Sequence, residues 1–233
     1  MQQALLIFKK EFKDYFASPI AYIVIAVFLI VTGWHFLPTF FLFDQADLRR
    51  FFNLLPIVFA LVVPIITMRL FSEELNVGSW ELLLTLPVTF RDIIIGKFMA
   101  AVAFVVAILI PTLSYPIFIS FIGDLDWGAV IGGYVGAVFL GGAYAAIGLF
   151  ASALTRNQII ACIVAMVICV ALALLDWVVF FLPQSMVDVV AHISAYAHFT
   201  NIAKGIVDTR DIIYFLSISF LGMYATLLVM EEK

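Results

Sequence analysis

Charged residues are scarce in this 233-residue sequence, where Asp, Glu, Lys and Arg together make up only 12%. Hydrophobic residues make up 65%, and the mean hydropathy is +1.18. Soluble domains contain about 45–50% apolar residues, so a soluble fold of this length would leave much apolar surface in water. The small net charge of −4 comes with no basic cluster, which argues against nucleic-acid binding. We therefore expect a membrane protein.

Catalytic and metal-binding motifs are also missing. The phosphate-binding loop of nucleotide hydrolases requires Gly-x-x-x-x-Gly-Lys-Ser/Thr; the Gly96-Lys97 pair has Arg91 in place of the first glycine and no following Ser or Thr. Neither His-Glu-x-x-His nor Gly-x-Ser-x-Gly occurs, and the three histidines show no metal-ligand spacing. Cys162 and Cys169 would lie about 10 Å apart along one helix, too far for a disulfide. The sequence predicts no catalytic residue, no metal site and no cofactor on this chain.

Long apolar runs account for most of the sequence. A membrane span needs about 20 mostly apolar residues, and in lipid every backbone polar group must pair internally, which favours helices. We expect an all-α polytopic membrane protein with transmembrane helices over residues 20–43, 51–70, 92–122, 128–154, 159–182 and 212–230. The third segment is longer than a bilayer requires. It either tilts, breaks at Pro111 and Pro116, or begins below the membrane surface.

Two segments outside the spans are amphipathic. Residues 1–17 carry apolar side chains at helical spacing, namely Leu5, Phe8, Phe12 and Tyr15, with lysines on the other faces. This pattern predicts a retained helix at the membrane surface, not a cleaved signal peptide. Residues 183–211 show a similar periodicity, which predicts one or two surface-lying or re-entrant helices on the external side.

The distribution of lysine and arginine gives an orientation. With both termini in the cytoplasm, eight of the twelve basic residues lie inside: Lys9, Lys10, Lys13, Arg69, Arg91, Lys97, Arg156 and Lys233. The other four lie outside: Arg49, Arg50, Lys204 and Arg210. Because cytoplasmic loops carry the excess of positive charge, we expect cytoplasmic N- and C-termini.

The fourth predicted span is rich in glycine. Gly132 and Gly136 share one helical face, and Gly141 shares a face with Ala145. Small residues at this spacing let helices approach closely in lipid. The glycines indicate either packing within the chain or a role in a dimer interface or pathway.

Residues 72–91 form the most distinctive polar segment. Gly78 permits a sharp turn, Ser79 is a good helix N-cap, and Glu81 lies where a helix dipole favours an acid. Pro87 ends the short helix that these residues predict. Such a helix, with several apolar residues, suits insertion into a groove on a cytosolic partner, although an ordinary amphipathic loop helix has the same pattern.

The order of residues in this segment resembles a known signature. Glu73-Glu74-x-x-x-Gly78-Ser79-x-Glu81-Leu82-Leu83-x-x-Leu86-Pro87, followed by Gly96-Lys97, is similar to the signature of ABC-2 type transporter permeases. The resemblance covers essentially the whole chain. Three further stretches resemble the gliding-motility-associated branch of that family: Ser18-Pro19-Ile-Ala-Tyr22, Ala197-His198-Phe199, and the run from Gly205 to Leu216.

This resemblance implies a type V exporter-like ABC-2 fold in the bacterial inner membrane. Two permease halves, identical or different, would pair through spans two and five and act with two separate ATPase subunits, which bind ATP and Mg²⁺. The residues implied to contact the ATPase are Glu73, Glu74, Gly78, Ser79, Trp80, Glu81, Leu82, Leu83 and Pro87. The gliding branch implies an accessory protein with an extracytoplasmic domain. Alternative functions are a membrane anchor without transport and a channel or secondary transporter working alone.

Overall fold

The computed structural model describes residues 2–43, 47–84, 87–121, 123–178, 187, 190, 192–206 and 208–233. All regular structure in these residues is helical. Six helical segments within them are long and apolar enough to cross a membrane. The predicted all-α, six-span architecture is therefore confirmed.

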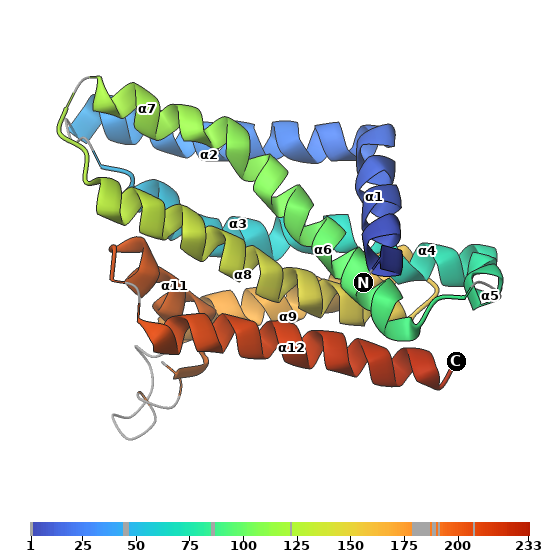
Figure 1. The fold of residues 1–233 in the computed structure, drawn as a ribbon. Coiled ribbons are helices and arrows are strands. Elements are labelled where there is room, and N and C mark those ends of the chain that lie inside the picture. Colours follow the sequence, from blue (N-terminus) through green and yellow to red (C-terminus); the bar gives the residue numbers. More distant parts are fainter. Residues whose placement is uncertain are drawn as a thin grey trace.

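The long helices run side by side and form one elongated bundle (Figure 1). The six candidate spans consist of α2 (Pro19–Phe43), α3 with α4 (Arg49–Thr67 and Arg69–Val77), α6 with a 3₁₀ turn and α7 (Phe90–Leu109, Ile110–Leu113 and Ser114–Ser120), α8 (Trp127–Leu154), α9 (Gln158–Val178) and α12 (Thr209–Glu231).

The two ends of the bundle differ. One end, which we call the terminal end, carries both chain termini together with α4 and the short helix α5 (Ser79–Leu84) (Figure 1). Helix α1 (Gln2–Ala17) crosses the direction of the spans there, as expected of a helix lying on a membrane surface. The opposite end, which we call the distal end, carries α7 and α11 (Ala195–Ala203).

Helix α8 lies at the centre of the bundle and packs against α3, α6, α9, α11 and α12. A Cβ atom at Gly132 would overlap the carbonyl oxygen of Ile202, and one at Gly136 would lie 3.1 Å from the Ile202 side chain. A Cβ at Gly141 would lie 2.5 Å from Val105. These close approaches all occur within one chain. A role of the same glycines in a dimer remains a prediction.

The second predicted span differs from the structure at its terminal end. The sequence suggests that it stops at residue 70, but after a break at Met68 the chain continues as a helix to Val77. The polar residues of α4 suggest a loop. However, Leu70, Phe71 and Leu75 lie on one buried face of α4, and their packing stabilises the helix beyond the apolar run.

The long third span breaks near its middle. Helix α6 ends at Leu109, the 3₁₀ turn includes Pro111, and α7 follows. Pro111 has no N–H to donate to a continuing helix, whereas Pro116 lies in the first turn of α7, where proline is tolerated. Of the three alternatives for this span, the structure shows a break, and the break is at Pro111.

The remaining helix boundaries differ from the predicted ones by a few residues. Helix α12 begins before the predicted residue 212, because the Asp208 side chain caps it by accepting a hydrogen bond from the Arg210 N–H. Helix α9 is described to Val178, and the predicted continuation to residue 182 lies outside the described residues. In the external segment, α11 is the helix that the structure describes, and most of residues 183–191 lie outside it.

Candidate functional site

The distinctive polar segment forms a bent pair of helices at the terminal end. Gly78 has a φ of +77°, in the left-handed region, and ends α4. Helix α5 begins at the next residue, so Ser79 is its first helical residue and not the predicted cap. Glycine adopts positive φ without the steric cost that a Cβ atom imposes. The sequence therefore determines the bend between α4 and α5 through this one glycine.

Several residues predicted to contact a partner are exposed on this helix pair. Glu73, Gly78, Glu81 and Pro87 face outward, and so does Val77 at the tip. Leu82 and Leu83 lie in α5, but their side chains lie outside what the structure describes. The exposed side chains that the structure describes on this pair therefore include two acids, Glu73 and Glu81, and one large apolar residue, Val77.

Trp80 faces the opposite way. Its side chain is only 5% exposed and packs between two rings, with centroid distances of 5.8 Å to Phe71 and 5.9 Å to Phe90. The indole N–H is buried without a hydrogen-bond partner. Trp80 thus joins α5 to α4 and α6, and any effect on a partner would be indirect.

A buried ionic cluster lies directly behind α4. Lys97 on α6 is 1% exposed, and its Nζ donates hydrogen bonds to Glu74 Oε1 at 2.8 Å, Glu11 Oε1 at 3.0 Å and the carbonyl oxygen of Leu70 at 2.7 Å. These partners come from α4 and α1. One ammonium group therefore joins three helices that are far apart in the sequence.

The cluster holds two carboxylates around the buried cation. Lys10 supplies a second, mostly exposed cation, with its Nζ 3.4 Å from Glu11 Oε1 and 3.9 Å from Glu74 Oε1. Partial burial by itself would lower the pKa of the Lys10 ammonium, but the nearby carboxylates of Glu11, Glu74 and Asp14 outweigh it and raise the pKa. A buried charge is tolerated only when it is paired and hydrogen-bonded, so the cluster requires α1, α4 and α6 together.

Helix α1 is held against the bundle at further points. A Cβ at Gly96 would lie 2.8 Å from the carbonyl oxygen of Ala4, so α1 and α6 are in backbone contact there. The Tyr15 hydroxyl donates to the Ile66 carbonyl at 3.3 Å, and the Arg69 guanidinium lies 5.0 Å from the Tyr15 ring centroid. Burial raises the pKa of the Tyr15 phenol, so the group stays neutral.

The junction between α3 and α4 is fixed to the central helix. Ser152 Oγ on α8 accepts hydrogen bonds from the backbone N–H groups of Phe71 at 2.9 Å and Ser72 at 3.0 Å. It also donates to the carbonyl of Met68 at 2.8 Å. The first N–H groups of a helix have no partner inside that helix, and here a side chain from α8 satisfies two of them. A displacement of α4 must therefore act on α8.

Sequence reasoning missed three residues of this site. Glu11 and Ser152 were not predicted to take part, and Lys97 appeared only as a topological charge and as part of the signature. A signal for Lys97 was present, because a lysine inside an apolar helix needs a partner. The identity of that partner depends on tertiary contacts.

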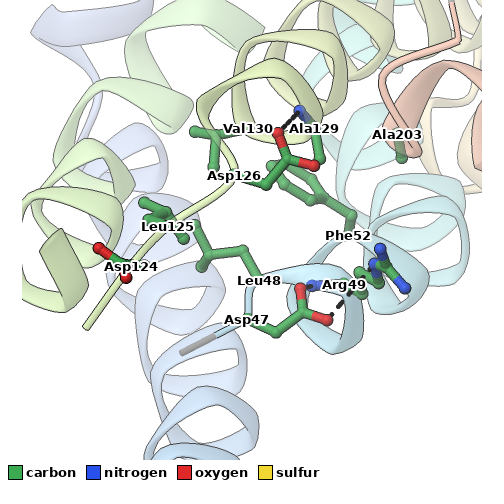
Figure 2. Close-up of a pocket in the computed structure, with 10 residues that line it drawn as sticks. All are labelled: Asp47, Leu48, Arg49, Phe52, Asp124, Leu125, Asp126, Ala129, Val130 and Ala203. Atoms are coloured by element: carbon green, nitrogen blue, oxygen red, sulfur yellow. Dashed lines mark hydrogen bonds and ion pairs between the residues drawn. The ribbon is translucent and has the colours of Figure 1, made fainter. Parts of the chain in front are cut away.

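The distal end contains a pocket of about 210 Å³, whose lining combines three aspartates and one arginine with apolar residues (Figure 2). Asp126 accepts hydrogen bonds from the N–H groups of Gly128 and Ala129, which makes it the N-cap of α8. Asp47 accepts from the Arg49 N–H at 2.8 Å and pairs with the Arg49 side chain. Both carboxylates therefore stabilise the local backbone.

A hydrogen-bonded contact between a histidine and an aspartate also lies at the distal end. His198 Nδ1 on α11 lies 2.6 Å from Asp211 Oδ1 on α12, and the imidazole stacks on Tyr214 with a centroid distance of 4.1 Å. These residues are close in sequence. Among the described residues, no group of three or more His, Cys, Asp or Glu side chains could hold a metal ion.

A comparison with known protein families identifies the family of this chain. Residues 5–229 match the family described as ABC-2 family transporter protein. The chain belongs to the ABC-2 transporter family. No curated protein matches it. As an ABC-2 chain with six apolar helices, it is a multi-pass integral membrane protein and a permease component of an ABC transporter.

Family membership also bears on chemistry. ABC-2 permeases are membrane components that are generally not catalytic themselves, and members generally act with an ABC ATPase and form dimers. The terminal-end site of this ABC-2 permease contains hydrogen-bonded and ionic contacts between helices.

Proposed function

We propose that this chain couples ATP hydrolysis on a separate ATPase subunit to movement of its own transmembrane helices. In this proposal α4 and α5 form the coupling element, whose exposed surface docks on the ATPase. The main support is the ionic cluster of Lys97, Glu74 and Glu11, which joins α4 to α6 and α1. A push on the exposed helix pair would then move three helices as one body.

The orientation of the chain is part of the proposal. The chain would lie in the inner membrane of a bacterial cell. Its terminal end would face the cytoplasm, because the basic residues concentrate at that end. ATP and Mg²⁺ would bind to the ATPase subunits and not to this chain.

Movement would reach the membrane through α8. The three hydrogen bonds of Ser152 tie the start of α4 to this central helix, and α8 in turn packs on most of the other spans. The apolar face that α9 leaves exposed, which includes Ile159, Ile163 and Val167, is available for a second permease half. The proposal also assigns the chain to the gliding-motility-associated branch, whose members would act with an accessory protein that has an extracytoplasmic domain.

Co-expression with the cognate ATPase tests this function. We expect a stable complex whose ATPase activity depends on the permease. Glu81→Arg reverses an exposed charge on α5 and should weaken complex formation roughly tenfold or more, since 1.4 kcal/mol corresponds to tenfold. Glu231→Arg makes the same change on α12 and serves as the matched control.

The outcomes separate the alternatives. Equal loss in both variants, or an intact and coupled complex after Glu81→Arg, would overturn the role of α5. ATPase binding without any nucleotide-dependent movement of the spans would favour the membrane anchor. Substrate flux in liposomes that contain only this chain would favour an independent channel or transporter.

A further inference from the structure

A groove between α6 and α12 has no role in the coupling site. It opens on the side of the bundle near the terminal end and encloses about 470 Å³. Apart from one cation its lining is apolar, with Ile94, Ile95, Phe220, Met223, Tyr224 and Leu227. The rings of Phe220 and Tyr224 stack with a centroid distance of 6.2 Å and form one wall.

The one cation stands at the polar end of the groove. Arg91 lies in the first turn of α6, beside Leu227 in the last turns of α12, and its side chain is exposed. It makes no ion pair with any residue in the described part of the chain. An unpaired guanidinium at this level would lie at the boundary between lipid headgroups and acyl chains, where arginine binds phosphate well.

The groove continues along α12 away from Arg91. A second hollow shares Phe220 and extends to Ile213, Leu216, Ser217 and Leu221. From Leu227 to Phe220 the helix rises roughly 10 Å, and from Leu227 to Ile213 roughly 21 Å. One leaflet of a bilayer contributes about half of a hydrocarbon core of roughly 30 Å. The apolar track therefore spans the depth of one leaflet.

We infer that this groove is a binding site for one anionic phospholipid. Its phosphate pairs with Arg91, and an acyl chain lies between α6 and α12 against Ile95 and the Phe220–Tyr224 wall. The charge pattern favours a lipid over a second protein chain, because a single cation above an apolar track matches an anionic headgroup above its tail. The terminal-end leaflet is the cytoplasmic one under the proposed orientation, and anionic lipids are abundant there.

Binding to the purified full chain tests the inference without any ATPase, so its failure is distinguishable from failure of the proposed coupling. Native mass spectrometry in detergent, with added phosphatidylglycerol or phosphatidylcholine, measures the lipid retained. We expect phosphatidylglycerol to be preferred and Arg91→Gln to reduce that preference about fivefold. Ile95→Trp, which fills the groove, should reduce retention of both lipids.

Arg156→Gln is the matched control, because it removes an exposed charge at the same end without lining this groove. Equal effects of Arg156→Gln and Arg91→Gln would show diffuse surface attraction and overturn the site. Tyr224→benzoylphenylalanine, irradiated in vesicles of phosphatidylglycerol and phosphatidylcholine, identifies the occupant. Crosslinks to lipid are expected, whereas crosslinks between two copies of the chain would place protein in the groove and overturn the inference.

Discussion

At the terminal end, Lys97 joins residues 86 and 23 positions away, whereas at the distal end His198 pairs with Asp211 only 13 positions along the chain. The distal carboxylates Asp47 and Asp126 bind backbone N–H groups of their own helix starts. Charges at the terminal end thus connect helices that are far apart in the sequence, whereas polar side chains at the distal end cap single helices or join the two consecutive helices α11 and α12. This difference is expected if the terminal end receives a force and the distal end does not transmit one.

Removing the buried cation should have the largest effect. Lys97→Met leaves Glu11 and Glu74 facing each other without their buried partner and with only the mostly exposed Lys10 nearby. Breaking a buried pair in this way costs about 3–5 kcal/mol. Unfolding in mixed micelles, followed by tryptophan fluorescence, measures the loss. Lys204→Met, which removes an exposed lysine at the distal end, should be nearly neutral.

A combined variant sharpens the same prediction. Lys97→Met with Glu11→Gln and Glu74→Gln removes all three charges and should recover much of the stability that Lys97→Met loses, because no uncompensated buried charge remains. If the triple variant is no more stable than the single one, the loss came from packing around Lys97. The inferred difference between the two ends, in which buried charges join helices at the terminal end, would then not hold.

The junction at Ser152 should have the next largest effect. Ser152→Ala leaves the N–H groups of Phe71 and Ser72 buried without partners, at a cost of about 1–3 kcal/mol. Hydrogen exchange should rise in α4. Ser217→Ala removes a hydroxyl whose one hydrogen bond among the described residues goes to the Ile213 carbonyl of its own helix, so it should change α4 little. Equal exchange in the two variants would argue against the junction.

Removing a helix cap at the distal end should lower stability less, and its effect should stay local. Asp126→Ala removes the N-cap of α8 and should cost about 1 kcal/mol, with faster hydrogen exchange confined to the first turn of α8. Asp126→Asn keeps the acceptor and should be close to the parent protein. Faster exchange that extended to α4 would mean that the distal end is coupled to the terminal end, against the comparison.

The two ends also differ in how far the sequence predicts them. The spans follow from long apolar runs, and the bend at Gly78 follows from the need for positive φ. The partners of Lys97 could not be predicted, because Glu11 and Glu74 meet it only after three helices pack. Ser152 stands among small residues of α8, a context that favours a packing interpretation, and its three hydrogen bonds depend on where α3 breaks.

The continuation of the second span as α4 is another feature that the sequence alone does not predict. Ser72, Glu73 and Glu74 indicate a polar loop when they are considered in sequence order. Their helix forms because Leu70, Phe71 and Leu75 on its other face are buried by neighbouring helices. Tertiary packing therefore determines the secondary structure of the segment that carries the proposed function.

The smallest effect should come from the exposed edge of the ionic cluster. Because the pKa of Lys10 is raised above its ordinary 10.5 in the folded chain, its contribution to stability is full below the unfolded pKa and is lost as the pH rises through the folded pKa. The contribution should stay below about 1 kcal/mol, since the side chain is mostly exposed. Comparing unfolding of the parent chain and Lys10→Gln from neutral pH to above roughly 10.5 measures it.

The difference between these two proteins should shrink as the pH rises, and Lys9→Gln, which removes an exposed lysine of the same helix, should show no such change. A difference that grows with pH would mean that Lys10 opposes the cluster. High salt should also reduce the Lys10 effect while leaving the Lys97 effect largely intact, because screening acts mainly on exposed charges. That contrast would separate the buried core of the cluster, which joins the helices, from its exposed edge.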